Sequence, residues 1–144
     1  LGYPFRFVEL AQDINASMPE YVASRIDGLL QTAGITLASA HVLLLGVTYK
    51  ADIADQRESP ARPLARLLLE RADRVSYHDP HIETWTVDDQ ELHSVTDLEG
   101  AVEAADIVVL LQAHREYDAT ALAHRAQRFL DTRGLVRDGS AETL

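Results

Sequence analysis

The stretch "HVLLLGVTYKADIADQRESP", residues 41–60, joins a continuous apolar run to a polar loop and a helix start. The run at 41–47 is typical of a strand buried on both faces of a parallel sheet. Ser59 and Pro60 favour a helix beginning there, because serine caps helices well and proline suits the first helical position. Between them lies Lys50, the only lysine of the chain beside 12 arginines. The stretch therefore predicts strand, charged loop and helix in succession.

The rest of the chain repeats this alternation. Apolar runs predict three further strands, and intervening segments predict three helices: strands at 74–80, 106–113 and 128–132, helices at 59–72, 97–105 and 118–126. Residues 81–96 suggest one short strand in "ETWTVDD", and the tail after Gly134 is expected to be loose. Strands that alternate with helices indicate an α/β, Rossmann-like fold, a parallel sheet with flanking helices.

A long helix is predicted ahead of this sheet. Apolar residues recur every three or four positions over residues 7–33, which indicates one apolar helical stripe. Pro19 removes a backbone donor in its middle, so we expect a kink or a restart there. The chain thus divides into residues 1–36, a helical segment, and residues 37–144, an α/β domain. The stripe could cover the domain's own core or bind a missing partner or second copy.

Composition narrows the class of protein. The net charge of −10 argues against a nucleic-acid partner, and no apolar run is long enough to span a membrane. The absence of cysteine excludes disulfides and thiolate sites and is consistent with a cytoplasmic protein. The acidic, lysine-poor composition suits either a high-salt cytoplasm or the bias of a GC-rich genome. Because the chain starts without methionine, we expect it to be cut from something longer.

Ligands of parallel sheets bind beyond the carboxyl ends of the strands, which points to four residues here. Lys50 and Arg57 lie in the loop after the first strand, Asp79 follows the second, and Arg133 follows the fourth. Lys50, Arg57 and the start of the next helix could form an anion site, or the loop could be a solvated surface. Asp79 could accept a bond from a ribose hydroxyl or cap its Asp-Pro turn. The histidines of "HDPH" form no convincing metal site. A lone Gly46 does not make a dinucleotide-binding fingerprint.

The loop carries a motif that resembles the C-terminal domain of the UDP-glucose/GDP-mannose dehydrogenase family. The matching residues are Gly46, Tyr49, Lys50, Asp55, Arg57, Glu58, Ser59 and Pro60. "VSYHDPH" and "FLDTRGLV" are similar to the family's next strand and late strand. "FRFVELAQDINASMPEYVASRI" resembles the helix that links the two halves of those enzymes and forms their dimer interface.

The resemblance implies a function for each part of the chain. Tyr49, Lys50 and Arg133 would bind the UDP-sugar substrate, and Arg57 would reach NAD. Residues 1–36 would be the linking and dimerisation helix, and residues 37–144 the nucleotide-sugar-binding domain. The family oxidises the C6 alcohol of a nucleotide sugar to the acid with an NAD domain and a catalytic cysteine. This chain has neither, so we expect no catalytic residue within it, no activity of the fragment alone, and a homodimeric full-length enzyme.

The sugar and the role of the chain stay open at this stage. The "SMPEYV" helix and the Tyr-Lys pair favour a UDP-N-acetylhexosamine over UDP-glucose. The main alternative to a fragment of an enzyme is a stand-alone, non-catalytic module that binds sugar nucleotides. A structural dimerisation domain with a decayed site is a third reading, and the retained Tyr49, Lys50, Arg57 and Arg133 argue against it.

Overall fold

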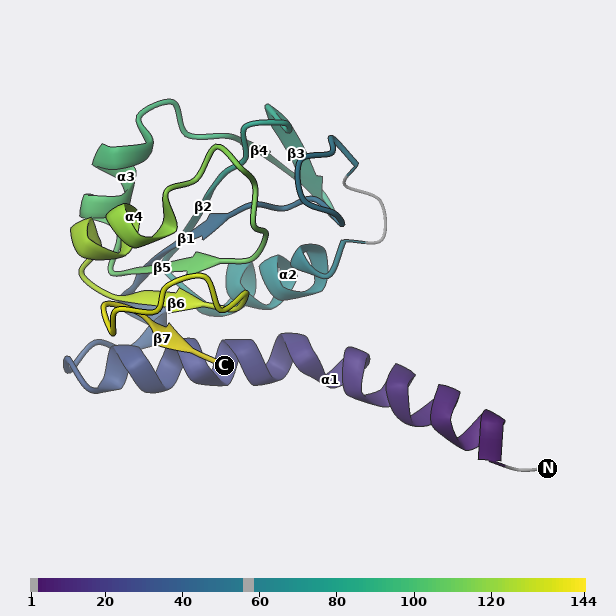
Figure 1. Ribbon diagram of the computed structural model, residues 1–144. Helices are drawn as coiled ribbons and strands as arrows, with labels where there is room; N and C mark the ends of the chain where they lie inside the picture. The colour runs from purple at the N-terminus through teal and green to yellow at the C-terminus, as the bar shows by residue number, and fades with distance from the viewer. Residues whose placement is uncertain (1–2, 56–58) are drawn as a thin grey trace.

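A computed structural model describes the backbone of residues 3–55 and 59–144, and within those ranges the side chains from residue 17 onward. Its elements in chain order are α1 (Tyr3–Gln31), the 3-10 helix η1 (Leu37–Ser39), β1 (His41–Leu45), α2 (Ala61–Arg71), β2 (Arg74–His78), β3 (Thr84–Val87), β4 (Gln90–His93), α3 (Leu98–Ala104), β5 (Ile107–Leu110), α4 (Ala119–Arg125), β6 (Phe129–Asp131) and β7 (Glu142–Thr143). Figure 1 shows a sheet with helices on both sides, which confirms the predicted α/β fold.

The main sheet has five strands in the order β2-β1-β5-β6-β7. Every neighbouring pair is parallel, as the buried apolar runs predicted. The chain passes from β1 to β2 in one direction and then crosses back to place β5 and β6 on the other side of β1. The order therefore reverses between β1 and β5, and at such a switch point the loops that follow the two strands diverge.

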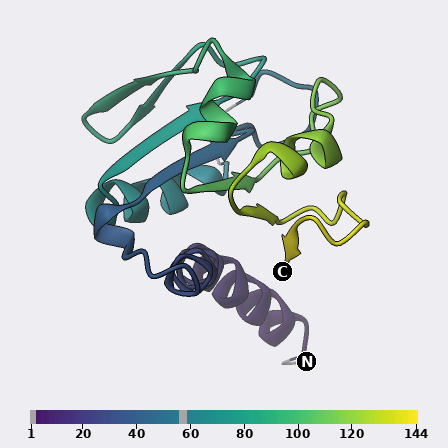
Figure 2. The same ribbon diagram turned by 90° about the vertical axis from the view of Figure 1, so that its left-hand side faces the viewer.

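Both faces of the sheet are covered, and alternate residues of β1 show how. Val42 and Leu44 pack in a cluster with α1 and α2, whereas Leu43 and Leu45 pack with residues of α3 and α4. Figures 1 and 2 show these two helix pairs on opposite sides of the sheet. All four β1 side chains are fully buried. A strand of this kind needs no polar face, which is why its sequence reads as an unbroken apolar run.

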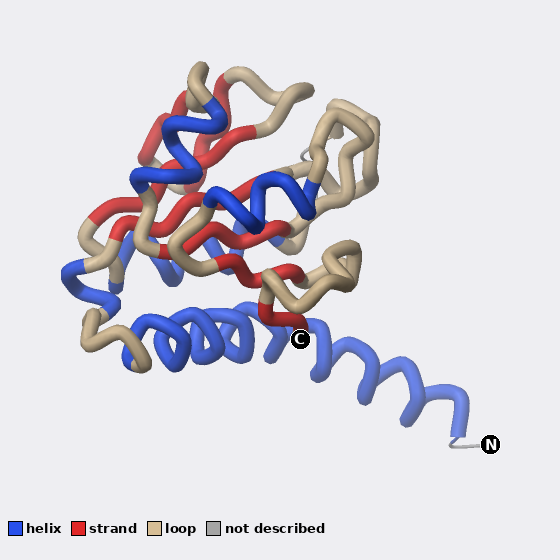
Figure 3. Tube along the Cα trace, turned by 60° about the vertical axis from the view of Figure 1, so that its left-hand side comes forward, coloured by secondary structure: helices blue, strands red, loops and turns tan. Residues whose placement is uncertain are grey.

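Helix α1 is continuous through Pro19, so the proline does not start a new helix. From Val22 onward its apolar stripe is buried in the domain's own core, with Ile26 and Leu30 fully enclosed. Figure 3 follows α1 along the sheet and past its edge. Helix α1 also contacts the C-terminal end of the chain, because Arg25 Nη2 donates a hydrogen bond to the carbonyl oxygen of Thr143 at 3.0 Å. Among the described residues, no helix is both long and apolar enough to cross a bilayer.

Two strands were not predicted. Residues 81–96 hold an antiparallel hairpin of β3 and β4 instead of one short strand, and Asp88 at its turn has φ of 53°. The buried β3 residue Trp85 packs edge-on against Tyr77 with ring centroids 5.3 Å apart, but β4 is mostly exposed and shows little apolar pattern. The tail is not wholly loose, because β7 pairs with β6. Its two residues are exposed and give no local signal.

Candidate functional site

A cavity of about 810 Å³ opens at the carboxyl edge of the sheet. Its lining comes from α1, from the loop after β1, from the start of α2, from the segments after β5 and β6 and from the C-terminal end of the chain. These residues include Met18, Pro19, Val22, Gly46, Thr48, Tyr49, Ser59, Pro60, Ala61, Leu64, Leu111, Thr132, Arg133 and Leu144. The volume lies within the usual range for small-molecule sites, and the lining combines apolar side chains with a few polar groups.

The start of α2 forms one end of this cavity. The helix begins at Ala61, one residue later than predicted, with Pro60 as its N-cap residue. Ser59 is buried, and its hydroxyl accepts a hydrogen bond from the Ala61 amide at 3.2 Å. The Arg62 amide donates to the Ser59 carbonyl at 3.2 Å, and Pro63 has no N–H. What the helix start offers is the positive potential of its N-terminal end, which favours an anionic group. This end of the cavity is therefore suited to a phosphate.

Two of the three predicted substrate residues lie together in the cavity lining. Tyr49, which is 52% exposed, and Arg133 both line the cavity. Lys50 is exposed and follows Tyr49 in the same loop, but it is not part of the lining. Asp79 is buried beneath the loop. Arg57 lies outside the described residues, so the NAD contact assigned to it stays a prediction.

Arg133 lies on a turn whose backbone is held by Asp131, two residues earlier. The carboxylate of Asp131, fully buried, accepts hydrogen bonds from the amides of Arg133 at 2.8 Å, Gly134 at 2.9 Å and Val136 at 2.8 Å. Gly134 has φ of 71°, which allows the chain to turn sharply after the arginine. One carboxylate therefore fixes the backbone that carries Arg133 to the cavity.

The loop with Tyr49 and Lys50 is held by residues that follow β5. Gln112 Nε2 donates to the carbonyl oxygens of Thr48 at 3.3 Å and Tyr49 at 3.0 Å. The chains approach closely here, because a Cβ added to Gly46 would lie 2.7 Å from Gln112 Cβ. Gly46 has φ of 81°, so glycine serves both the backbone conformation and the contact.

His114 is the buried centre of this arrangement. Its Nδ1 lies 2.8 Å from the Asp52 amide, and its Nε2 lies 3.0 Å from Asp79 Oδ2 and 3.2 Å from Thr48 Oγ1. The Thr48 hydroxyl itself donates to the Lys50 carbonyl at 2.7 Å. An amide can only donate, so Nδ1 is the acceptor, and Nε2 carries the hydrogen shared by Asp79 and Thr48. The contacts thus select one tautomer.

Asp79 acts within the protein through both carboxylate oxygens. Oδ1 accepts from the His81 amide at 2.8 Å, which confirms that Asp79 caps its Asp-Pro turn. Oδ2 accepts from the Val47 amide at 2.7 Å and faces His114. Both oxygens are already met by protein donors, and the ribose contact suggested for Asp79 stays a prediction.

Burial shifts the pKa values of two groups next to this network. It raises the pKa of the Tyr117 phenol far above its usual value and lowers the pKa of His78. The Tyr117 hydroxyl donates to the His78 carbonyl at 2.8 Å and lies 2.9 Å from His78 Nδ1. At the surface of the network, a hydrogen bond from the Arg115 amide lowers the pKa of Asp52. The rings of His78 and Tyr117 thus connect the end of β2 with the segment after β5.

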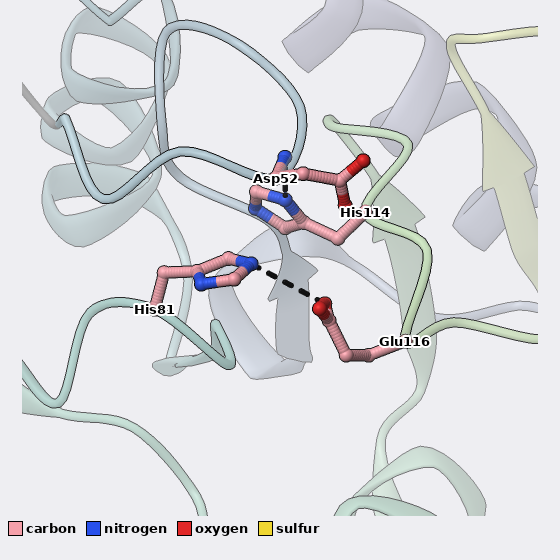
Figure 4. A group of neighbouring side chains, drawn as sticks. All are labelled: Asp52, His81, His114 and Glu116. Atoms are coloured by element: carbon pink, nitrogen blue, oxygen red, sulfur yellow. Dashed lines mark hydrogen bonds and ion pairs between the residues drawn. The ribbon is translucent and has the colours of Figure 1, made fainter.

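Four side chains here offer metal-ligand atoms: Asp52, His81, His114 and Glu116 (Figure 4). The atoms lie within 4.8 Å of one another. Both ring nitrogens of His114 already have protein partners, and His81 Nε2 lies 3.3 Å from Glu116 Oε2. A cation bound at His114 would have to break one of the bonds that hold the loop. Hydrogen bonds therefore fix Asp52 and His114, whereas the buried His81 Nε2 has no hydrogen-bond partner among the described residues and faces Glu116 at ion-pair distance.

Sequence reasoning pointed to the carboxyl edge of the sheet, where this cavity lies, but did not single out Gln112, His114 and Asp131. The signal for the first two is a pair of polar residues directly after the buried run of β5. For Asp131 the signal is an acidic residue at the end of an apolar strand, followed two positions later by an arginine. All three act on backbone groups of the loops that carry Tyr49, Lys50 and Arg133.

Comparison with known proteins gives concordant matches. The model of the UDP-glucose/GDP-mannose dehydrogenase family, UDP binding domain, matches residues 43–141. A UDP-N-acetyl-D-mannosamine dehydrogenase of Methanococcus vannielii is 32% identical over 112 residues, which are 78% of this chain and 24% of that protein. The chain thus spans about a quarter of the length of that curated relative.

Solved structures agree with this match. A UDP-glucose dehydrogenase from the archaeon Pyrobaculum islandicum superposes with a TM-score of 0.73 at 29% identity, over 92% of this chain and 30% of that one. The UDP-D-ManNAc dehydrogenase of Pyrococcus horikoshii shares the fold, with a TM-score of 0.78 at 22% identity over 99% and 33% of the two chains. The chain belongs to the UDP-glucose/GDP-mannose dehydrogenase family, and its residues 43–141 correspond to the UDP binding domain of that family.

Proposed function

We propose that this chain is the substrate-binding domain of an NAD-dependent nucleotide-sugar 6-dehydrogenase that acts on a UDP-N-acetylhexosamine or UDP-glucose. The observation that carries the proposal is the cavity at the carboxyl edge, which Tyr49, Arg133 and the first turn of α2 line together. A nucleotide sugar has a diphosphate that needs positive charge and flat rings that need apolar walls. The cavity offers both kinds of surface in one place.

Each residue has a role in this proposal. Arg133 provides a planar, bidentate donor for a phosphate or a sugar oxygen. Tyr49 lies half exposed at the cavity and presents an aromatic ring to the substrate. Lys50, in the next position, supplies a compact charge on a flexible stem that can swing to the bound substrate. The chain's own residues thus bind and orient the sugar nucleotide.

NAD belongs to a different part of the enzyme in this proposal. In dinucleotide folds, a short glycine-rich turn after the first strand brings the backbone to the pyrophosphate. Here the connection from β1 to α2 contains one glycine, and that glycine is packed against Gln112. The residues present do not form such a cradle. We therefore assign NAD to a domain outside this chain, which Arg57 would contact, in a cytoplasmic enzyme that dimerises through α1.

Binding is tested by calorimetry with UDP, UDP-N-acetylglucosamine, UDP-glucose, GDP and the free sugars. UDP and the UDP-sugars should bind, whereas the free sugars should not. Arg133→Ala should weaken UDP-sugar binding roughly 10- to 150-fold, since a hydrogen bond from a charged donor contributes about 1.5–3 kcal/mol. Arg137→Ala is the matched control, because Arg137 is exposed in the same segment but does not line the cavity. Equal affinities for the two variants would contradict the assignment.

Catalysis is tested separately by following NADH absorbance. The chain alone should form no NADH from any UDP-sugar, because it has no cysteine for the oxidation. The full-length gene product should form NADH if it adds a dinucleotide-binding domain and a cysteine. A gene product that binds UDP-sugars but contains neither would instead establish the alternative, a non-catalytic binding module.

A further inference from the structure

His114 connects three segments at the carboxyl edge and has no exposed side-chain surface. Its ring accepts from the Asp52 amide on one side and donates to Asp79 and Thr48 on the other. The contacts to Thr48 and Asp52 flank the two residues Tyr49 and Lys50. A single side chain from the segment after β5 therefore holds both ends of the turn that carries the proposed substrate contacts.

The far end of this turn has a backbone that needs such support. Asp52 has φ of 62°, a conformation that residues other than glycine adopt rarely. Its amide points to His114, and its carboxylate accepts from the Arg115 amide at 2.7 Å. Uncommon backbone conformations persist where surrounding contacts determine them. Loss of the bond to Nδ1 should let Asp52 relax and shift the turn that carries Tyr49 and Lys50.

The near end is fixed by the other nitrogen. Nε2–H is shared between Asp79 Oδ2 and Thr48 Oγ1, so the Thr48 hydroxyl is free to donate its own hydrogen to the Lys50 carbonyl. The backbone of Lys50 is thus oriented through Thr48, while Gln112 holds the carbonyls of Thr48 and Tyr49. The directions of all these bonds are consistent only with the tautomer that carries hydrogen on Nε2.

We propose that His114 is a positioning residue that holds the turn at residues 48–52, and with it Tyr49 and Lys50, in the conformation that binds the sugar nucleotide. This rests on the proposed function of the cavity. His114 does not line the cavity itself, so it acts through the loop. Its effect on binding should depend mainly on the acceptor that it offers to Asp52.

Two near-isosteric variants separate the two sides of the ring. In His114→Asn the amide oxygen takes the place of Nδ1 and keeps the bond to Asp52, but the donor to Asp79 is lost. In His114→Gln the amide nitrogen takes the place of Nε2 and keeps the donor to Asp79, but the acceptor for Asp52 is lost. Each variant loses the hydrogen bonding of one ring nitrogen, and Asp79 Oδ2 keeps its bond from the Val47 amide, so both should lose stability to a similar extent. A purely structural role would therefore affect them alike.

The first measurement needs no ligand: amide hydrogen exchange of Asp52, followed by NMR. Exchange should accelerate about 10-fold or more in His114→Gln and stay within about 3-fold of the parent in His114→Asn. The second measurement is calorimetry with UDP-N-acetylglucosamine, in which His114→Gln should lose about 10-fold in affinity and His114→Asn clearly less. Unchanged exchange in His114→Gln, or faster exchange with unchanged affinity, would overturn the proposal. A parent chain that binds no UDP-sugar would overturn the proposed function, and the exchange data would still report whether His114 holds the turn.

Discussion

Two loops at the carboxyl edge of the sheet carry the basic residues assigned to the substrate, and they are held in different ways. The turn at residues 131–136 is closed by Asp131, which bonds three amides within five positions of itself. The loop at residues 46–55 is held chiefly by Gln112 and His114, whose side chains contact it from 62 to 66 positions away along the chain. Arg133 therefore has a local support that its own sequence encodes, whereas Lys50 depends on the packing of β1 beside β5.

The largest loss of stability is expected at the turn at residues 131–136. Asp131→Ala should lower the free energy of unfolding by about 3 kcal/mol or more, because three amides lose a buried acceptor and each unsatisfied group costs about 1–3 kcal/mol. Chemical denaturation measures the loss. Asp138→Ala is the control, since Asp138 bonds the Ser140 amide in a similar way but is exposed. A similar loss in both variants would show that burial does not distinguish this turn.

An intermediate effect is expected where the distant segments touch. Gly46→Ala combines a left-handed backbone with a Cβ placed 2.7 Å from Gln112 Cβ, and it should cost about 2 kcal/mol or more. Gly139→Ala has a similar φ of 87° but open space around the added carbon, and it should cost about 1 kcal/mol. The two unfolding free energies measure the difference. Equal losses would mean that the approach of β1 and β5 does not constrain the loop.

The smallest effect on stability is expected at Lys50, in the loop at residues 46–55. Lys50→Ala should change the free energy of unfolding by no more than about 0.5 kcal/mol, because the side chain is exposed. The same variant should weaken sugar-nucleotide binding in calorimetry, and Lys50→Arg should restore it only in part, because a planar guanidinium does not replace a compact ammonium. Parent-like affinity in Lys50→Arg would indicate that the single lysine is an accident of composition.

The sequence by itself determined the parallel α/β fold, the buried strands and the edge of the sheet where Tyr49 and Arg133 meet. Apolar runs, helix starts and turn residues are local signals, and they act over a few positions. These local signals did not predict β4 and β7, whose residues are mostly exposed. Strands of this kind form because a neighbouring strand offers free backbone groups, and a local pattern does not show that neighbour.

Only the tertiary structure decided how the loop after β1 is held. Gln112 and His114 follow β5, and their contacts with Thr48 and Asp52 exist because β5 lies beside β1 in the sheet. The choice of tautomer and the contact of the Asp52 amide with His114 depend on that pairing, whereas Asp79 reaches His114 because it follows β2, which pairs with the other side of β1. Hydrogen bonds between distant segments depend on ångström-scale placement, which the order of residues constrains only after the whole sheet has formed.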